Sequence, residues 1–308
     1  MLIAKKKLVT SILRSKYCYL SGIVSGSPEK TNRWSKFFNI SQKNCYNSQN
    51  FDSIINNPAI DIVYIVLPTF MHAEFTIRAA KAGKHVICEK PMATSSEEAE
   101  KMINACKNAN VKLGIGYRLY YEPHHLKLQE LVQFKTFGNI KGIKSSFGFK
   151  LQNKFNWRLD DKLGGGAIMD LGIYPIQNAC RLMGEQPISV KASNENDQIN
   201  WVFEFENSVM VKSYTTFSEY IDKLSVTFEN GTCELSPAFD LSNIKGISID
   251  KKTPLYTKNY QAIKQIDDFA CSVLNNTIPK CSGEEGKSHI LLIEKIRLAL
   301  ETGETIRI

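Results

Sequence analysis

Lys90 stands between an acid and a proline, where an apolar run ends and a helix is expected to begin, in the stretch "VICEKPMATSSEEAE" (86–100). A lysine at the end of a buried strand costs desolvation free energy unless something there uses its charge. Its long stem can also carry the ammonium group to water, so the local sequence leaves a catalytic and a solvent-exposed role open.

A second group of reactive side chains lies in "GGGAIMDLGIYPI", residues 164–176. The three glycines permit close backbone approach, and a helix would place Asp170 and Tyr174, four residues apart, on one face. With a lysine in reach, a carboxylate and a phenol form an acid–base set, in which Lys90 polarises a substrate hydroxyl and Tyr174 accepts its proton. The alternative is a glycine-rich turn before an ordinary buried tyrosine, since Pro175 could start a new helix and spoil the spacing.

The elements that must position Lys90 alternate between strand and helix in the first third of the chain. Ser27 and Pro28 are typical of a helix start, and Ser95 with Glu98 forms a capping box. We expect strands over 19–26, 60–68, 85–89 and 112–117, with helices over 27–38, 73–82 and from 95 onward. This order predicts a parallel, doubly wound sheet that binds ligands at the carboxyl ends of its strands.

Beyond residue 120 the pattern changes to a helix over 122–134 followed by strands. Six strand-like segments, 140–149, 188–193, 199–207, 208–217, 223–230 and 231–236, are joined in part by the turn signals "FENS" and "FENGT". Helices near 261–275 and 286–302 finish the chain. We therefore expect a first domain over 1–120 and, over 121–308, an α+β domain with a mostly antiparallel open sheet. One face of such a sheet needs covering, commonly by a partner subunit.

Ser25 ends the first expected strand, where a Rossmann unit usually carries Asp or Glu to bind the ribose 2′-hydroxyl of NAD. Here small Ser25 and Ser27 with Lys30, and Arg33 nearby, would suit a 2′-phosphate instead. The segment therefore favours NADP over NAD, although Ser and Lys are also common at helix starts.

The composition is that of an ordinary globular protein, with 308 residues, 43% hydrophobic and 23% charged. The net charge of +8 is spread along the chain, so the three lysines at 5–7 predict a solvated helix face, not a nucleic-acid patch. The sequence shows no apolar stretch of membrane-spanning length and no signal-peptide pattern at its start.

The eight cysteines form no C-x-x-C pair and fall mostly in apolar segments, which predicts reduced core thiols in a cytoplasmic protein. His124 and His125 are adjacent with no third ligand near, so we interpret them as a surface or helix-start pair and expect no metal site.

Together these motifs resemble the Gfo/Idh/MocA family of oxidoreductases, most closely its glucose–fructose oxidoreductase branch. The resemblance runs from about residue 15 to the end and includes E-K-P, G-G-G-x-x-x-D-x-G, "DIVYIVLPTFMHAEFTIRAAKAGKHVICEKPMATS", "IGYR", "WRL" and "SGEEG". It implies a Rossmann domain that carries NAD(P), a second domain whose open sheet forms a dimer or tetramer, and hydride transfer at a sugar or polyol carbon.

The resemblance also implies roles for individual residues. Lys90 matches the catalytic lysine, Asp170 the acid that positions substrate, and Tyr174 the branch's tyrosine, a proton relay where most of the family has histidine. Tyr117 and Arg118 match a pair beside the nicotinamide and substrate. The implied cofactor-binding residues are Ser25, Lys30, Pro68, His72, Glu89, Lys90, Arg118, Trp157 and Arg158, and the substrate-binding ones Tyr117, Arg118, Asp170 and Tyr174.

One departure from the family concerns the start of the chain. The family begins with a strand and a glycine-rich turn that holds the pyrophosphate, whereas "LIAKKKLVTSIL" (2–13) is helical in pattern and no glycine precedes Gly22. The strands expected at 20–24 and 61–67 would then lose the strand between them. An upstream start, a truncated gene or a loss of the need for cofactor would each explain this.

The leading hypothesis is an NADP-dependent oxidoreductase acting on a sugar or polyol. One alternative is a non-catalytic relic or binding protein of the same family, and another is a cyclic-diol dehydrogenase. The segment "FKLQNKFNWRLDDK" (149–162) predicts only an aromatic, polar and basic pocket lining, so the substrate stays open.

Overall fold

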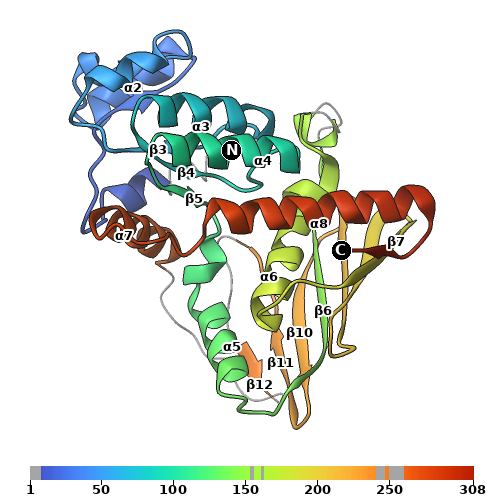
Figure 1. The fold of residues 1–308 in the computed structure, drawn as a ribbon. Helices are drawn as coiled ribbons and strands as arrows, with labels where there is room; N and C mark the ends of the chain where they lie inside the picture. The colour runs from blue at the N-terminus through green and yellow to red at the C-terminus, as the bar shows by residue number, and fades with distance from the viewer. Residues whose placement is uncertain (1–7, 153–155, 161–162, 241–246, 250–259) are drawn as a thin grey trace. The chain divides into compact units, whose positions relative to one another are not determined.

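The computed structural model describes residues 8–152, 156–160, 163–240, 247–249 and 260–308 (Figure 1). The chain divides into two compact units. The first comprises the described parts of Met1–Ala93, Glu97–Arg118 and Tyr260–Gly286, and the second those of Thr94–Ser96, Leu119–Asn259 and Lys287–Ile308. A segment from late in the sequence thus belongs to the first unit.

The first unit contains a parallel three-stranded sheet in the order β3-β4-β5. Its strands are β3 (Ile62–Ile65), β4 (His85–Cys88) and β5 (Leu113–Ile115), connected by α3 (His72–Lys81) and α4 (Ser96–Asn108). Short 3₁₀ helices lie at η2 (Phe51–Asn56) and η3 (Thr69–Met71). The predicted parallel α/β arrangement is confirmed, because each pair of sheet strands is joined through a helix.

A separate two-stranded parallel sheet, β1 (Ile23–Val24) with β2 (Cys45–Tyr46), precedes it, with α2 (Pro28–Phe37) and η1 (Gln42–Asn44) between the two strands. Among the described residues β1 and β3 lie in different sheets, in line with the gap expected between these two strands. β1 is shorter than the predicted strand over 19–26. The predicted start of α2 is confirmed, since the Ser27 hydroxyl accepts a hydrogen bond from the Lys30 amide at 3.3 Å.

A late segment extends the first unit, because α7 (Gln261–Leu274) and the residues after it pack on β5. The Ile115 amide donates to the Cys281 carbonyl at 2.8 Å. A Cβ added at Gly114 would lie 2.6 Å from the Phe269 ring, so glycine is what permits this close packing.

The second unit is built on an eight-stranded sheet in the order β12-β11-β10-β6-β9-β8-β7-β13. All neighbouring pairs are antiparallel except β6 and β9, which are parallel. The strands are β6 (Ile140–Gly148), β7 (Ser189–Glu195), β8 (Gln198–Glu204), β9 (Met210–Thr216), β10 (Ile221–Phe228), β11 (Gly231–Leu235), β12 (Ile247–Ile249) and β13 (Ile306–Arg307). The predicted mostly antiparallel sheet and both predicted hairpin turns are confirmed.

The helical elements of the second unit include α5 (Pro123–Gln133), α6 (Ile173–Met183), the 3₁₀ helix η5 (Trp157–Leu159) and the π-helical turn η6 (Ile168–Gly172). The 3₁₀ helix η4 (Arg118–Tyr121) begins with the last residue of the first unit and continues in the second. α8 (Gly283–Thr302) begins in the first unit and runs into the second. α6 packs against β6 and β9. Alternate sheet residues such as Trp201, Phe203 and Val211 are fully buried and form the core on that side.

The structure also tests the predictions about the cysteines, the histidine pair, the first helix and membrane-spanning segments. The eight cysteines are all free thiols, and five are buried. His124 and His125 do lie at the start of α5, but both are buried, so their expected place on the surface is wrong. Residues 8–12 are helical, whereas the lysines at 5–7 lie outside the described residues. No helix within the described ranges has both the length and the hydropathy needed to cross a membrane.

Candidate active site

Lys90 lies directly after β4, in a half-buried turn with a cis peptide bond to Pro91. The buried His72 ring braces this turn from α3. Its Nδ1 lies 2.9 Å from the Pro91 carbonyl oxygen and its Nε2 lies 2.9 Å from that of Leu67. His72 therefore ties the turn after β4 to the segment that follows β3.

Burial and hydrogen bonds to the backbone act in opposite directions on the pKa of the His72 ring. Burial lowers the pKa of the imidazole, while the hydrogen bonds to the carbonyls of Leu67 and Pro91 act in the opposite direction. Both ring nitrogens are occupied by the protein backbone. Any contribution of His72 to cofactor binding would thus act through the shape of the Lys90 turn.

Glu89, the residue before Lys90, is held by a polar chain that the sequence analysis did not single out. The Tyr64 hydroxyl donates to Glu89 Oε1 at 2.9 Å, and Gln265 Nε2 donates to the Tyr64 oxygen at 3.2 Å. Burial raises the pKa of Glu89, and the Tyr64 hydrogen bond, Lys90 and Arg118 oppose that rise. A tyrosine inside the apolar run of β3 was the only available signal for this chain.

Tyr117 and Arg118 follow β5, next to the end of β4. The Gly116 amide donates to the Cys88 carbonyl at 2.7 Å, and a Cβ added at Gly116 would lie 3.1 Å from atoms of Glu89. Arg118 is buried, and its Nη1 donates to Gln261 Oε1 of α7 at 3.1 Å. The structure therefore brings Glu89 and the segment from Tyr117 to Arg118 together at the carboxyl edge of the sheet.

Pro68 lies at the same edge, after β3, where its carbonyl accepts the Met71 amide at 2.9 Å and starts η3. Three neighbouring parallel strands thus end in Pro68, in the Glu89–Lys90 turn and in Tyr117–Arg118. In α/β folds this is the edge at which ligands bind.

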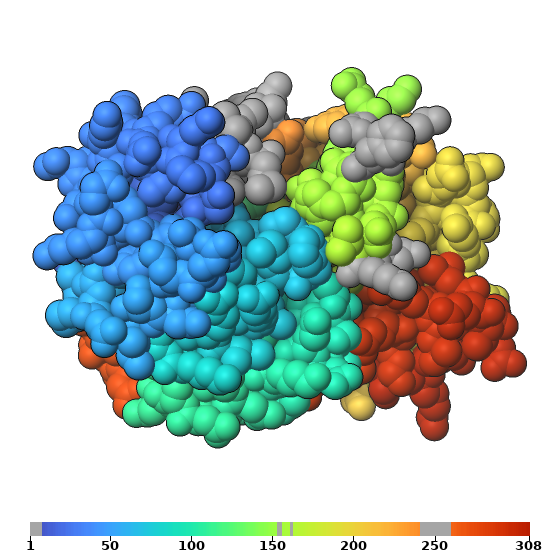
Figure 2. Space-filling model, turned by 90° about the horizontal axis from the view of Figure 1, so that it is seen from above, coloured from blue at the N-terminus to red at the C-terminus, as the bar shows by residue number. Residues whose placement is uncertain are grey.

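A polar pocket of about 340 Å³ lies in the same unit, at the carboxyl ends of β1 and β2. The residues around it, numbered 25–49, belong to the blue part of the surface in Figure 2. The Ser25 hydroxyl accepts the Ser27 amide at 3.2 Å, and the Lys30 side chain is exposed on α2. The pocket is lined by Ser25, Gly26, Pro28, Thr31, Asn32, Gln42, Cys45, Tyr46, Asn47, Ser48 and Gln49.

These residues fit one end of a dinucleotide. The volume falls in the range of small-ligand pockets, and hydroxyl and amide groups supply donors and acceptors for a ribose or a base. The place of the pocket, beyond the carboxyl ends of two parallel strands, is where Rossmann-type sheets hold a nucleotide.

Asp170 lies in the second unit, in the π-helical turn η6, which continues without a break into α6. Pro175 lies in the first turn of α6, which begins at Ile173, and Asp170 lies in the π-helical turn before it, so the plain α-helical spacing assumed for Asp170 and Tyr174 does not hold. Arg158 Nε donates to Asp170 Oδ2 at 2.8 Å, and only 24% of the arginine side chain and 16% of the aspartate side chain are exposed. Asp170 is thus held by a partly buried ion pair.

The glycine-rich segment places Trp157 and Arg158 beside η6. A Cβ added at Gly164 would lie 2.4 Å from Arg158 Cα, so the predicted close backbone approach of this glycine is observed. Gly165 has φ +70°, which also favours glycine. The Arg158 guanidinium stacks 4.6 Å from the centre of the Trp157 ring.

Tyr174 is buried in an aromatic cluster of α6, β6 and the segment after β11. Phe147 meets its ring edge-on at 5.4 Å between centroids, and Phe239 lies at 6.1 Å. Phe239 is fully buried, and the backbone that carries it is held by Asp222, which accepts the amides of residues 238–240 at 2.7, 2.7 and 2.8 Å. Phe147, Phe239 and Asp222 belong to no motif, so their part in this cluster could not be predicted from the sequence.

Comparison with known proteins shows which family shares this sequence and fold. The family model described as "Oxidoreductase family, NAD-binding Rossmann fold" matches residues 3–117, and that of the GFO/IDH/MocA C-terminal domain matches residues 125–234. The crystal structure of an aldose-aldose oxidoreductase from Caulobacter crescentus, complexed with glycerol, is 30% identical with a TM-score of 0.93, covering 100% of this chain and 97% of that one. The chain belongs to the Gfo/Idh/MocA family.

As a member of the Gfo/Idh/MocA family, the chain is an NAD(P)-dependent oxidoreductase acting on CH–OH groups. A D-xylose 1-dehydrogenase [NADP(+)] from Haloarcula marismortui is 28% identical over 270 residues, 81% of this chain and 75% of the relative. A levoglucosan dehydrogenase in complex with NADH and levoglucosan has a TM-score of 0.85 at 19% identity, covering 99% of this chain and 97% of that one, which shows the fold alone.

Proposed function

We propose that this Gfo/Idh/MocA oxidoreductase uses NADP to transfer hydride to or from a sugar or polyol carbon, as in the glucose–fructose branch. The observation that carries the proposal is the likeness of the whole chain to an aldose-aldose oxidoreductase, at 30% identity. The similarity to an NADP(+)-dependent xylose dehydrogenase supports the same class of substrate.

In this proposal the nicotinamide, when bound, supplies the hydride acceptor or donor. Lys90 is the cation that polarises the substrate hydroxyl, and the His72 ring holds the turn that carries Lys90 through its contact with the Pro91 carbonyl. Glu89 beside it and Arg118 at the end of β5 balance charge at the same edge of the sheet. This arrangement suits a hydroxyl whose proton leaves as hydride departs from the carbon.

The second unit contributes the groups that hold substrate and move its proton. Tyr174 exchanges the hydroxyl proton, and the rings of Phe147 and Phe239 restrict its orientation. Asp170, paired with Arg158, orients a sugar hydroxyl as a hydrogen-bond acceptor. These roles rest on the match to the family's motifs, and the contacts within the unit support them.

The choice of NADP rests on the end of β1. Ser25 stands there in place of the acid that would bind a ribose 2′-hydroxyl, and Ser25 lines the polar pocket. Lys30 is exposed in the first turn of α2, where its ammonium can reach a phosphate. We further propose that the open sheet of the second unit forms a homodimer or homotetramer.

A second candidate function is oxidation of a cyclic diol. The observation that favours it is Phe147, a partly exposed ring edge-on to Tyr174, because a flat apolar ring packs well against an aromatic side chain. A panel that contains both aldoses and cyclic diols separates the two candidates by their kcat/KM values.

The first test is a titration of the purified protein with NADPH, followed by nicotinamide fluorescence, with NADH as the control. Saturable binding with NADPH preferred is the expected result, and turnover of a sugar or polyol should follow in the substrate panel. Preference for NADH would reject the cofactor choice. Absence of binding to either would favour a non-catalytic relative.

A further inference from the structure

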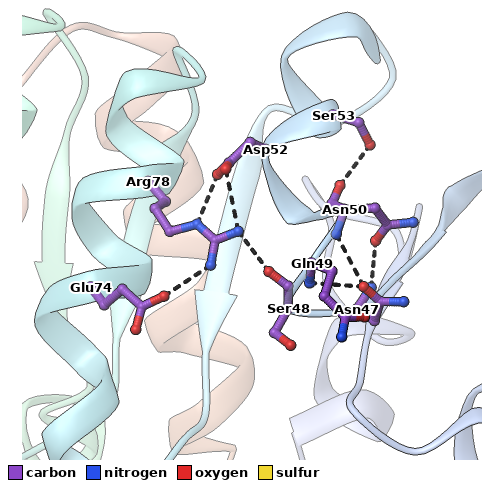
Figure 3. A network of polar contacts seen from close by, with 8 residues as sticks. All are labelled: Asn47, Ser48, Gln49, Asn50, Asp52, Ser53, Glu74 and Arg78. Carbon is purple, nitrogen blue, oxygen red and sulfur yellow. Dashed lines mark hydrogen bonds and ion pairs between the residues drawn. The ribbon is translucent and has the colours of Figure 1, made fainter.

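One wall of the polar pocket is a loop, residues 47–49, which follows β2 and precedes η2. Residues 47–49 lie outside any strand or helix, so side-chain hydrogen bonds are needed to fix the conformation of this loop. Figure 3 shows that Arg78, reaching from α3, is the side chain that contacts both the loop and η2. Arg78 itself does not line the pocket.

The Arg78 guanidinium uses its three nitrogens on three different groups. Nη2 donates to the Ser48 carbonyl at 2.7 Å and to Asp52 Oδ2 at 3.3 Å. Nε donates to Asp52 Oδ1 at 2.8 Å, and Nη1 donates to Glu74 Oε1 at 2.9 Å. The planar fork therefore fixes the backbone of the pocket wall relative to a helix.

The surroundings of Arg78 favour this single orientation. Its guanidinium carbon lies 5.2 Å from the centre of the Phe51 ring and 5.0 Å from that of Phe75. The two acids are 67% (Asp52) and 59% (Glu74) exposed, so neither ion pair alone adds much to stability. What the arrangement does supply is a fixed position for the Ser48 carbonyl.

The loop completes the arrangement with bonds of its own (Figure 3). The Asn47 side-chain oxygen accepts the amides of Gln49 and Asn50 at 2.9 and 3.0 Å, and the Asn47 amide donates to Asn50 Oδ1 at 2.7 Å. These bonds make 47–50 a compact turn. The hydrogen bond from Arg78 to the Ser48 carbonyl then fixes the position of this turn, and so of the pocket wall, relative to α3.

We propose that Arg78 is a positioning residue for the cofactor, which sets the affinity for the adenosine end by holding the 47–49 wall of the pocket. The proposal rests on the proposed function, in which this pocket receives that end of NADP. A lysine cannot replace the arginine, because a point charge cannot engage Ser48, Asp52 and Glu74 in one plane.

The test compares Arg78→Lys and Asp52→Asn with the control Glu74→Gln, which removes the charge of one Arg78 partner and leaves the contacts of Arg78 to the loop and η2 in place. Calorimetric Kd values for NADPH and for adenosine 2′,5′-bisphosphate are measured with the unfolding midpoint of each variant. We expect Arg78→Lys and Asp52→Asn to weaken both ligands by about tenfold, equivalent to about 1.4 kcal/mol. Glu74→Gln should stay within about twofold, and kcat at saturating NADPH should change little in all three.

Unchanged affinity in Arg78→Lys and Asp52→Asn would overturn this inference while leaving the proposed function intact. Failure of the unmodified protein to bind NADPH would overturn both. Binding of NADPH without binding of adenosine 2′,5′-bisphosphate would overturn this inference alone. If Arg78→Lys does not fold, Asp52→Asn decides the matter, because it keeps the arginine and loosens only its hold on η2. An equal loss in Glu74→Gln would show a general effect on α3 and would also reject the proposal.

Discussion

The Tyr64 hydroxyl donates a 2.9 Å hydrogen bond to the carboxylate of Glu89, the residue directly before Lys90. Burial raises the pKa values of both partners, so each is shifted toward its protonated form. The bond opposes this shift for Glu89, since it stabilises the carboxylate. A residue inside β3 thus controls the charge beside the candidate catalytic lysine.

We predict that Tyr64→Phe lowers the free energy of unfolding by about 1–3 kcal/mol at pH 7, because a buried carboxylate loses a donor. The pKa of Glu89 is already above 4.5 in the fold, so its cost to stability appears as the pH rises through that raised value. Removing Tyr64 raises the pKa further and enlarges the cost at neutral pH. Urea unfolding at pH 7 and pH 4 measures this, and an equal loss at both values would contradict it.

Lys90→Met tests the catalytic role of the lysine directly. We expect kcat to fall by about 100- to 10,000-fold, the usual contribution of a positioned acid–base group, with an unchanged unfolding midpoint. Lys81→Met, on the exposed end of α3, is the matched control and should retain full activity. Substantial turnover by Lys90→Met would reject the proposed mechanism.

Arg158→Lys tests how Asp170 is held. Lysine keeps the positive charge but loses both the Nε donor to Asp170 and the planar stacking on Trp157. We expect a rise in substrate KM of about tenfold, equivalent to about 1.4 kcal/mol, with little change in the Kd of NADPH. If the Kd of NADPH rises as much as KM, Arg158 acts on the cofactor, as the family resemblance suggested.

Elements with strong local signals could be predicted from the sequence. The apolar run over 60–68 contains β3, Ser27 caps α2 and Gly83, with φ +71°, follows the end of α3, since each signal depends on neighbouring residues alone. The glycine-rich segment before Asp170 also behaves as expected, because only glycine tolerates the approach of the Arg158 backbone at Gly164.

Contacts between distant segments could not be predicted in this way. The parallel pairing of β6 with β9 and the packing of α7 on β5 depend on which surfaces fit, and the local pattern does not encode this. The same holds for Asp222, an acid on a strand whose partners are the amides of residues 238–240. His124 and His125 do start a helix, as one of the two interpretations held, but their burial and the hydrogen bonds of their amides to the Glu122 carboxylate could not be predicted from the sequence.

Asp222→Asn tests whether the clamp on residues 238–240 controls Tyr174 through Phe239. An amide presents one oxygen and one donor group, so it cannot accept all three backbone amides that Asp222 holds. We expect a loss of about 1–3 kcal/mol in the free energy of unfolding, because a buried donor is left without an acceptor. We also expect a fall in kcat of about tenfold as Tyr174 loses its fixed orientation, with substrate KM less affected.

The pH dependence of this loss has a defined sign. Burial raises the pKa of Asp222 above 3.8, so its contribution to stability declines as the pH rises through the raised value. The stability difference between the unmodified protein and Asp222→Asn should therefore narrow from acidic to neutral pH, as measured by urea unfolding at several pH values. Asp197→Asn, an exposed position, is the control and should change neither quantity. A variant that is less stable but has an unchanged kcat would limit Asp222 to a structural role and separate Phe239 from the chemistry of Tyr174.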